Sequence, residues 1–337
     1  MSDAQAVTAA LARVVAARIG RPGDVSALTR LTGGATKATW AFDAWVGAAS
    51  EPLILQQSFP RPATPGDPMA ALPRIAGADE AALLGLAAKA AIPVPTVRAT
   101  LAPEDGLGVG VIMDRLDGET LGARIARDAR FGDVRPALAA QCGHILAALH
   151  RIDSASAPFL VEHGPSAQLA LYRAIYESFD HPQPALELAF RWAATHAPVS
   201  APTAVVHGDF RNGNFIVGAD GIRAVLDWEL AHFGDPIEDL GWLCVKSWRF
   251  GVNDQRVGGF GAVEDLLTSY RSAGGREFDL AELRFWEAMG TLKWGVICEV
   301  QAFTHLQGAV RSVELATLGR RVAEMEWDLL ELIEGEA

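Results

Sequence analysis

The chain has 337 residues, enough for one large domain or for two domains of ordinary size. Half of the residues are hydrophobic and 21% are charged, a composition typical of globular proteins. The formal net charge of -12 argues against nucleic acid and anionic membranes as partners, because both bind surfaces rich in Lys and Arg. We therefore expect a small solute as the partner, and backbone amides or metal cations must bind any phosphate that it carries.

The cysteines and the N-terminus indicate a cytoplasmic protein. The three cysteines are far apart and include no CxxC pair, so we expect buried thiols and neither a disulfide framework nor a zinc site. The N-terminal stretch MSDAQAVTAALARVVAARIGR lacks the apolar block and cleavage site of a signal peptide. No run of the sequence reaches the roughly eighteen apolar residues that a membrane span requires.

The first 115 residues predict a small sheet with a helix on it. Short apolar and β-branched runs alternate with Gly and Pro, which interrupt strands and helices because they favour turns or supply no amide donor. In chain order, we expect a strand, a turn and a strand over 28–46, a strand over 52–57, a loop over 57–73, a helix over 78–92 and a strand over 109–116.

The rest of the chain predicts mostly helices. Residues 135–152 place apolar side chains on one helical face, and residues 168–197 continue in the same manner. The stretch VVHGDFRNGNFIVGADGIRAVLDW (205–228) breaks this pattern, because two β-branched runs flank the turn GADG and so predict a β-hairpin. Helices resume at about residue 236 and continue to the end.

The hairpin predicts where its polar side chains meet. Pairing back from the GADG turn places Asn214 near Val225 and leaves Asp227 just beyond the base of the ribbon. An Asn and an Asp at one point suit Mg²⁺, because this ion takes few protein oxygens and completes its shell with water and phosphates. We expect the carboxylate of Asp209 near that metal, where it remains able to accept a proton.

The segment HGDFRNGN followed by LDWE resembles the catalytic segment of the aminoglycoside phosphotransferase and choline kinase group, distant relatives of protein kinases. The sub-group that it resembles most includes domains fused to acyl-CoA dehydrogenases. The resemblance extends from GGATKATW (33–40) through the Trp-rich C-terminal helices. It implies an α+β, protein-kinase-like two-lobe fold, with a nucleotide-binding antiparallel-sheet N-lobe over 1–115 and a mainly helical C-lobe over 116–337 that carries the catalytic loop, metal site and acceptor pocket.

The resemblance also implies roles for single residues. Asp209 is the expected catalytic carboxylate, and Asn214 and Asp227 are the expected ligands of Mg²⁺. His207 is expected to be a scaffold residue of the loop, and Asp239, in GDPIEDLGWL, is expected to brace it. The implied reaction transfers the terminal phosphate of ATP or GTP to a hydroxyl of a small metabolite or drug-like acceptor, while Asp209 takes the proton.

A nucleotide site is implied at the sheet. The glycine turn lets backbone amides approach phosphates, although a glycine pair is also compatible with an ordinary hairpin turn. The strand that ends at Asp114 leads into the hinge against which the adenine hydrogen-bonds. The implied nucleotide-site residues are Gly33, Gly34, Ala35, Thr36, Lys37, Gln56, Met113 and Asp114.

One position departs from the family pattern. Gln56 stands on the third strand where the family has a Lys or Arg, which normally pairs with a Glu of the following helix. Glu80 is the natural candidate for that Glu. The chain has four lysines, and Lys37 in the glycine turn is the one placed to substitute. We hypothesise that Lys37, or Arg61 from the proline-rich loop, supplies the missing charge.

The stretch RFWEAMGTLKWGVICEVQAF (284–303) is apolar apart from a few charged residues, and a buried charge needs a partner. Since helices of this region line the acceptor pocket in related kinases, we hypothesise that Glu287, Lys293 and Trp294 touch the substrate. The tryptophans of these helices are also compatible with ordinary core packing.

Two other functions remain as alternatives. Gln56 motivates a nucleotide-binding protein with weak or no phosphotransferase activity. The GD and GN pairs also recur in metal-dependent phosphoesterases, but the sequence has no Asp-x-His and no His-x-His. We rank the kinase first and the phosphoesterase last, and the motif leaves the acceptor and the choice of ATP or GTP open.

Overall fold

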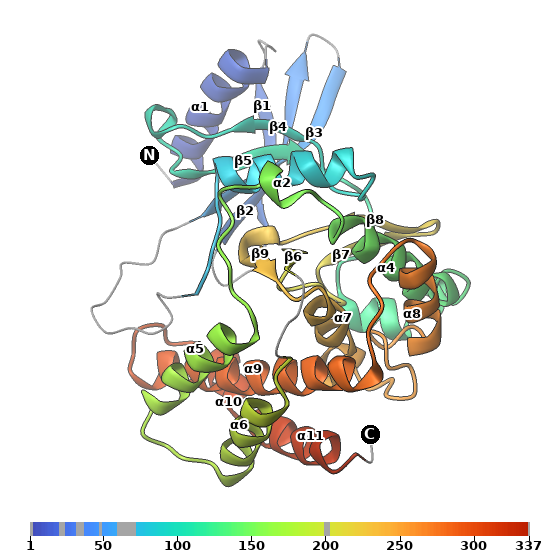
Figure 1. Cartoon of the computed structure of the whole chain (residues 1–337). Helices are drawn as coiled ribbons and strands as arrows, with labels where there is room; N and C mark the ends of the chain where they lie inside the picture. Colours follow the sequence, from blue (N-terminus) through green and yellow to red (C-terminus); the bar gives the residue numbers. More distant parts are fainter. Residues whose placement is uncertain are drawn as a thin grey trace.

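The computed structural model describes residues 3–19, 24–31, 37–46, 49–58, 72–198 and 203–335. A small sheet forms one end of the molecule, and helices form most of the remainder (Figure 1). This is the architecture that the sequence predicts. The hypothesis about the glycine turn concerns Gly33, Gly34, Ala35 and Thr36, which lie outside the described residues, as does Arg61.

The sheet has five antiparallel strands in the order β1-β2-β3-β5-β4. Four of the five strands are predicted by the sequence. The fourth along the chain is missed, because its four residues include a single buried side chain and so show no alternation. The strands are β1 (Val25–Leu31), β2 (Lys37–Val46), β3 (Ala49–Ser58), β4 (Val97–Thr100) and β5 (Val109–Asp114).

Helices pack on the sheet from two directions. Helix α1 (Asp3–Val14) buries Leu11 and Val14 in one core with Phe42 and Leu55 of the sheet. Helix α2 (Ala78–Lys89) belongs to the core of the helical part and contacts β4 and β5, so it lies between the sheet and the helices below it (Figure 1). This placement brings the first turn of α2, which contains Asp79 and Glu80, toward the helical part.

The helical part is organised around α9, a helix of 27 residues that crosses the molecule (Figure 1). Most of its side chains are buried, because helices α5, α6, α7, α10 and α11 all contact it. The bounds are α3 (Gly122–Arg127), α4 (Arg135–Leu149), α5 (Pro165–Glu177), α6 (Pro184–His196), α7 (Ile237–Cys244), α8 (Val263–Ser272), α9 (Leu280–Leu306), α10 (Val313–Gly319) and α11 (Val322–Glu334).

Two short ribbons lie between the sheet and these helices. The predicted hairpin is present as β7 (Phe215–Gly218) and β8 (Gly221–Val225). The second ribbon pairs β6 (Ala204–Val206) with β9 (His232–Gly234), and three-residue strands carry too little pattern to be predicted. The segments that leave these strands carry the candidate catalytic residues.

A bulge corrects the predicted register of the hairpin. The pairing shifts between Ile216 and Val217, so that Phe215, and not Asn214, lies opposite Val225. The amide of Leu226 donates to the carbonyl oxygen of Asn214 at 2.8 Å. The extra residue therefore moves Asn214 one position closer to Asp227 than the regular pairing predicts.

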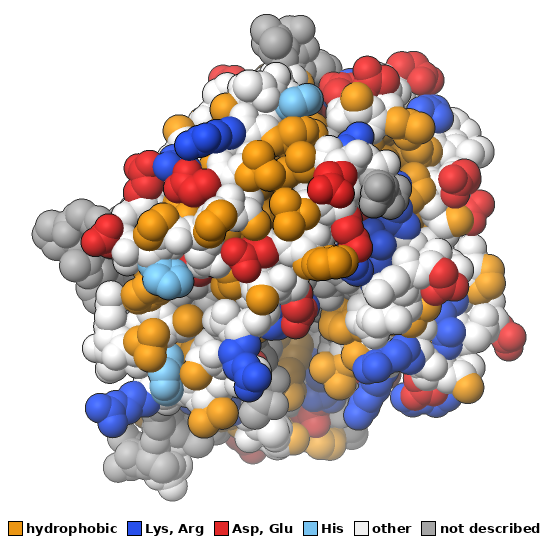
Figure 2. All heavy atoms as spheres, turned by 90° about the horizontal axis from the view of Figure 1, so that it is seen from below, with side chains coloured by type: hydrophobic (Ala, Val, Ile, Leu, Met, Phe, Trp, Pro, Cys, Tyr) orange, Lys and Arg blue, Asp and Glu red, His pale blue; other side chains and the backbone are white. Residues whose placement is uncertain are grey.

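The outer surface and the cysteines fit the composition. On the face seen from below, acidic and basic side chains are interspersed with hydrophobic ones (Figure 2). All three cysteines are free and buried, as the sequence predicts. Within the described ranges, no helix combines the length and the apolar character that crossing a membrane demands.

Helices α4 and α8 approach closely at Gly143. A Cβ at this position would lie 2.5 Å from the carbonyl oxygen of Leu266 and 2.7 Å from the amide nitrogen of Tyr270. Because both neighbours are backbone atoms, we expect Gly143→Ala to lower the free energy of unfolding by about 1 to 3 kcal/mol.

The matched control is Gly85→Ala on α2, where an added Cβ meets nothing within 4 Å. This control is expected to raise the free energy of unfolding by up to about 1 kcal/mol, because Ala favours the helix over Gly. Denaturant titration measures both variants. A Gly143→Ala protein as stable as the wild type would contradict the close packing of α4 on α8.

Candidate active site

The loop between β6 and β7 is bound by a buried carboxylate, that of Asp239 on α7. The amide of His207 donates to Oδ2 of Asp239 at 2.8 Å, and the amide of Gly208 donates to Oδ1 at 3.0 Å. Burial opposes ionisation of Asp239, but the hydrogen bond and charge of His150 and the donors at His207 outweigh it and lower its pKa. An ionised Asp239 thus fixes two successive amides, which supports the bracing role expected of it.

His207 joins two parts of the site through its ring. Its Nδ1 accepts a hydrogen bond from the amide of Asp209 at 3.2 Å, so the ring proton lies on Nε2. Nε2 donates to the carbonyl oxygen of Leu226 at 3.0 Å. Burial lowers the pKa of His207, which keeps the ring neutral in this arrangement. The scaffold role expected of His207 agrees with these contacts.

The carboxylate of Asp209 receives three hydrogen bonds. Oδ1 accepts from Nε1 of Trp242 at 2.7 Å and from Nε of Arg211 at 3.0 Å. Oδ2 accepts from Nδ2 of Asn214 at 2.7 Å. The side chain is 14% exposed, so solvent reaches a carboxylate whose orientation is already fixed.

Sequence analysis misses Arg211 and Trp242 as members of the site. A signal for both is present in the sequence. Arg211 follows Asp209 by two residues, and Trp242 follows Asp239 by three, which places the two side chains on one face of α7. The helix that braces the loop backbone therefore also supplies a donor to its carboxylate.

Asn214 and Asp227 offer the donor set of a magnesium ion. Nδ2 of the buried Asn214 donates to both the carbonyl oxygen and Oδ2 of Asp209, which turns its own amide oxygen away from them. Asp227 has a left-handed backbone (φ 62°, ψ 59°), which is uncommon outside Gly and concentrated at functional sites. Its side chain is 39% exposed.

Asn214 and Asp227 supply two protein ligands, a number that is compatible with Mg²⁺. Across the described part of the chain, no group of three or more His, Cys, Asp and Glu side chains could hold a metal ion. One amide oxygen and one carboxylate, completed by water and phosphate oxygens, are sufficient for Mg²⁺. The residues at 214 and 227 therefore fit this ion.

Lys37 is paired with Glu80, the residue predicted to partner the cation of the family pattern. Its Nζ is 2.8 Å from Oε1 of Glu80 and 3.1 Å from Oδ1 of Asp227. Burial would lower the pKa of Lys37, but Asp227, Glu80 and Glu229 outweigh burial and raise it. Lys37 is therefore a buried ammonium ion at the contact between the sheet, α2 and the segment after β8.

The strand pairing explains how Lys37 reaches this place. Lys37 on β2 pairs with Ser58 on β3. Ser58 lies two residues beyond Gln56 on β3. The adjacent strand thus delivers an ammonium ion close to the end of β3, as the substitution hypothesis requires. Met113 and Asp114 end β5 beside β3, and Asp114 accepts a hydrogen bond from Arg98 at 3.0 Å.

The three residues predicted to touch the substrate have different surroundings. Both carboxylate oxygens of Glu287 are engaged, by Arg249 at 2.7 Å and by Arg256. Lys293 is buried, and its ammonium donates to the carbonyl oxygen of Gly208 at 2.9 Å. Trp294 is partly buried against the buried Trp242, Val245 and Trp248. Their contact with a substrate remains a prediction.

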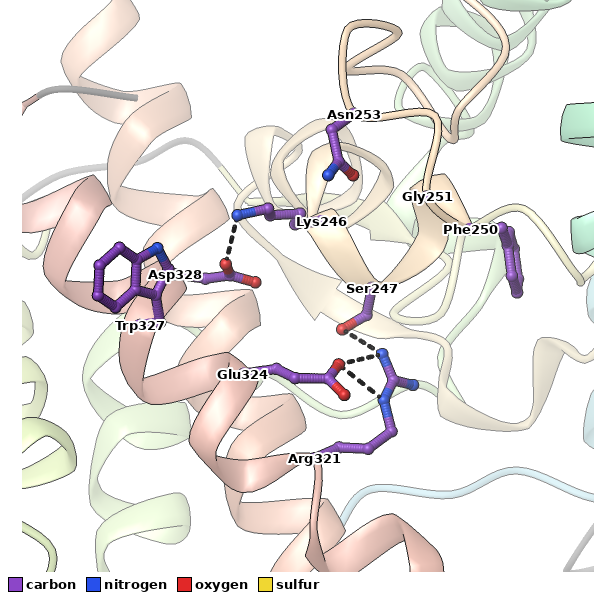
Figure 3. Close-up of a pocket in the computed structure, with 9 residues that line it drawn as sticks. All are labelled: Lys246, Ser247, Phe250, Gly251, Asn253, Arg321, Glu324, Trp327 and Asp328. Carbon is purple, nitrogen blue, oxygen red and sulfur yellow. Dashed lines mark hydrogen bonds and ion pairs between the residues drawn. The ribbon is translucent and has the colours of Figure 1, made fainter.

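A cavity of about 580 Å³ opens between η7 (Lys246–Arg249) and α11 (Figure 3). The two cations that line it are paired with carboxylates, Lys246 with Asp328 at 2.7 Å and Arg321 with Glu324 at 3.0 Å. None of the predicted catalytic, metal-binding or nucleotide-site residues lines this cavity, so it lies apart from the candidate active site. The cavity is lined by Lys246, Ser247, Phe250, Gly251, Asn253, Arg321, Glu324, Trp327 and Asp328.

Fold and site together define a class of protein. A small antiparallel sheet on a helical lobe, with a loop carboxylate followed by an Asn and then an Asp, is the arrangement of kinase-like phosphotransferases. A model of the phosphotransferase enzyme family matches residues 27–286. The chain belongs to this phosphotransferase family, and the predicted recognition is confirmed.

Two solved phosphotransferase structures are similar to this chain over almost its whole length. A candidate aminoglycoside phosphotransferase from Ralstonia eutropha is 20% identical, with a TM-score of 0.74 over 97% of this chain and 98% of that chain. A thermostable mutant of APH(4)-Ia, in ternary complex with AMP-PNP and hygromycin B, is 17% identical, with a TM-score of 0.64 over 97% and 99% of the two chains. These structures confirm the protein-kinase-like fold.

One relative is a much longer protein than this chain. Acyl-CoA dehydrogenase family member 10 of Mus musculus is 30% identical over 159 residues, which cover 43% of this chain and 15% of that protein. The chain spans less than a third of the length of the curated relatives that it matches. The predicted likeness to domains fused to acyl-CoA dehydrogenases is thus confirmed.

We expect the ammonium ion of Lys37 to contribute to nucleotide binding. Lys37→Met removes the ammonium ion but keeps a long side chain, and we expect ATP affinity to fall about tenfold to a hundredfold, the worth of a charge-assisted hydrogen bond. Isothermal titration with MgATP measures this change. Lys89→Met, at the exposed end of α2, is the matched control and should bind ATP as the wild type does. If Lys37→Met binds ATP as tightly as the wild type, the hypothesis that Lys37 replaces the missing strand cation is wrong.

Proposed function

We propose that the chain is a magnesium-dependent kinase that transfers the terminal phosphate of ATP or GTP to a hydroxyl group of a small acceptor. One observation carries the proposal. Asp209 is fixed by three donors, one of which is Asn214, and Asn214 is bonded to the residue that precedes Asp227. The likeness to a complex with AMP-PNP supports an adenine nucleotide as the donor.

In the proposed reaction, the acceptor hydroxyl binds to the carboxylate of Asp209. The bond between the terminal phosphorus and its bridging oxygen breaks, and a bond to the acceptor oxygen forms. The hydroxyl proton passes to Asp209. Because the transition state is loose, alignment of the two oxygens and stabilisation of spread negative charge provide most of the rate acceleration.

Cations on three sides offset that charge in the proposal. When bound, Mg²⁺ would be held by Asn214 and Asp227 and would neutralise the phosphate oxygens. Lys37, held by Glu80, would contact the phosphates from the sheet. Arg211 would contact the transferring group, because its guanidinium already lies at the carboxylate of Asp209.

The lobe boundary at residues 115 and 116 and the cytoplasmic location stay predictions.

The alternative is a nucleotide-binding protein with weak or no transferase activity. That alternative depends on Gln56 leaving the phosphates without a cation. The ammonium of Lys37 between Glu80 and Asp227 supports the kinase instead, because it supplies a cation at the place where the phosphates would bind.

A screen of hydroxylated compounds tests the proposal. Aminoglycosides, choline, hydroxylated amino acids and sugars are each added to the protein with MgATP or MgGTP, and ADP or GDP release is measured. We expect one class to stimulate release in the presence of Mg²⁺ and not in the presence of EDTA. Asp209→Ala should lose about a hundredfold or more of that rate, because it removes the proton acceptor. It should still bind nucleotide, because Lys37 is unchanged and the backbone carbonyl oxygen of residue 209 still accepts from Asn214.

Two outcomes would count against the kinase. Stimulated release that is equal in Asp209→Ala would exclude the proposed proton acceptor. Nucleotide binding without release for any compound would favour the alternative.

A further inference from the structure

The indole of Trp242 is the donor to Asp209 that belongs to the helical part. It lies on α7, is buried, and donates its single N–H to Oδ1 at 2.7 Å. An indole N–H is a donor in one fixed direction, because the ring is rigid and has no acceptor on that nitrogen. Trp242 therefore sets the direction of one carboxylate oxygen, while Asn214 sets the other.

The indole is itself held tightly. A Cβ on Gly290 of α9 would lie 2.9 Å from the ring of Trp242, so only a glycine lets α9 approach this closely. The ring of Trp248 packs against it with a centroid distance of 5.1 Å. Rotation of Trp242 away from Asp209 would require both neighbours to move.

Lys293 contacts both the ring and the loop. Its Nζ lies 4.6 Å from the centroid of the Trp242 ring and donates to the carbonyl oxygen of Gly208 at 2.9 Å. Gly208 directly precedes Asp209 and has a left-handed φ of 76°. One ammonium ion thus touches the backbone before Asp209 and the ring that binds its side chain.

Lys293 is a buried ammonium ion, and the carboxylate with which it pairs, that of Glu238, is 3.9 Å away. Burial would lower the pKa of Lys293, but the acidic groups around it outweigh burial and raise it. An uncharged residue would fill the same space without the desolvation that a buried charge requires. The cation attracts the π face of Trp242 and makes its N–H a stronger donor, an effect that a neutral side chain would not supply.

The lone pairs of Asp209 limit where a further donor can bind. An ionised carboxylate has about four acceptor positions, two on each oxygen. Trp242 and Arg211 occupy two positions on Oδ1, and Asn214 occupies one on Oδ2. Among the donors that the structure describes, the remaining position is on Oδ2.

We propose that Trp242 and Lys293 are positioning residues that direct the acceptor hydroxyl to Oδ2 of Asp209. Trp242 occupies Oδ1, and Lys293 fixes both the indole and the loop backbone. The inference rests on the proposed kinase function. Without the indole, the hydroxyl binds Oδ1 as readily as Oδ2, and only one of the two geometries is in line with the phosphate.

A double-mutant cycle tests the proposal without an identified acceptor. The probe is MgATP with water as the acceptor, and single-turnover ADP release is measured for wild type, Trp242→Phe, Asp209→Ala and the double variant. Trp242→Phe should lower the rate about tenfold to a hundredfold with the Michaelis constant for ATP unchanged. In the Asp209→Ala background, the same substitution should have no further effect, because its target is gone.

The control for Trp242→Phe is Trp327→Phe, since the Trp327 side chain is 64% exposed on α11. A rate in Trp242→Phe equal to that of this control would overturn the proposal. Losses that multiply in the double variant would also overturn it, because Trp242 would then act independently of Asp209. If Asp209→Ala alone leaves the rate unchanged, the proposed function fails, and the two failures are distinguished.

Lys293 is tested by two substitutions. Lys293→Met should lower the rate about tenfold, and Lys293→Arg should restore most of it, because the charge under the ring and the donor are kept. Thermal unfolding establishes that each variant is folded. Equal rates in a folded Lys293→Met and the wild type would remove Lys293 from the proposal, and if Lys293→Met does not fold, a Lys293→Arg rate as low as that of Trp242→Phe would do so.

Discussion

A single buried ammonium ion connects the two parts of the molecule. Lys37 is bonded to Glu80 of α2 and to Asp227 after β8, so the sheet, its helix and the hairpin segment meet at one nitrogen. A buried charge of this kind is stable only while its partners are in place, since an unpaired one costs several kcal/mol. This contact therefore joins the sheet and α2 to the segment that carries the candidate metal ligand Asp227.

The remaining parts of the site are built on backbone that is held from the helical side. Asp239 binds two amides of the loop, and the ring of His207 connects that loop to the segment before Asp227. Fixed dipoles and charges of this kind need no reorganisation when charge develops in a transition state. The long helix α9 supports the arrangement, because α7 packs against it and Lys293 reaches from it to the loop. Rigidity near Asp209 is thus a property of the whole helical part.

Periodicity and turn residues predict most elements, because long apolar patterns override local detail, and the resemblance to the phosphotransferase family implies the fold class. They do not predict the bulge between Ile216 and Val217, which depends on packing and has no residue signature here. The polar residues of the HGDFRNGN segment are predicted as site residues, because the segment resembles the catalytic segment of the family. Lys37 is predicted as a substitute cation, but its bond to Glu80 spans 43 positions and depends on how the sheet meets α2. Trp242 is not predicted as a site residue: its spacing from Asp239 places it on the same face of the helix, but a sequence does not reveal the direction of an indole N–H.

In the proposed site, Asn214 and Asp227 hold one divalent cation beside Lys37. Anomalous diffraction from crystals grown with Mn²⁺ and AMP-PNP tests it most directly, because Mn²⁺ replaces Mg²⁺ and its position is measured without reference to activity. The account predicts a manganese peak in contact with the amide oxygen of Asn214, a carboxylate oxygen of Asp227 and the nucleotide phosphates. Bound nucleotide with its manganese on other side chains, or with phosphates remote from Lys37, would contradict it.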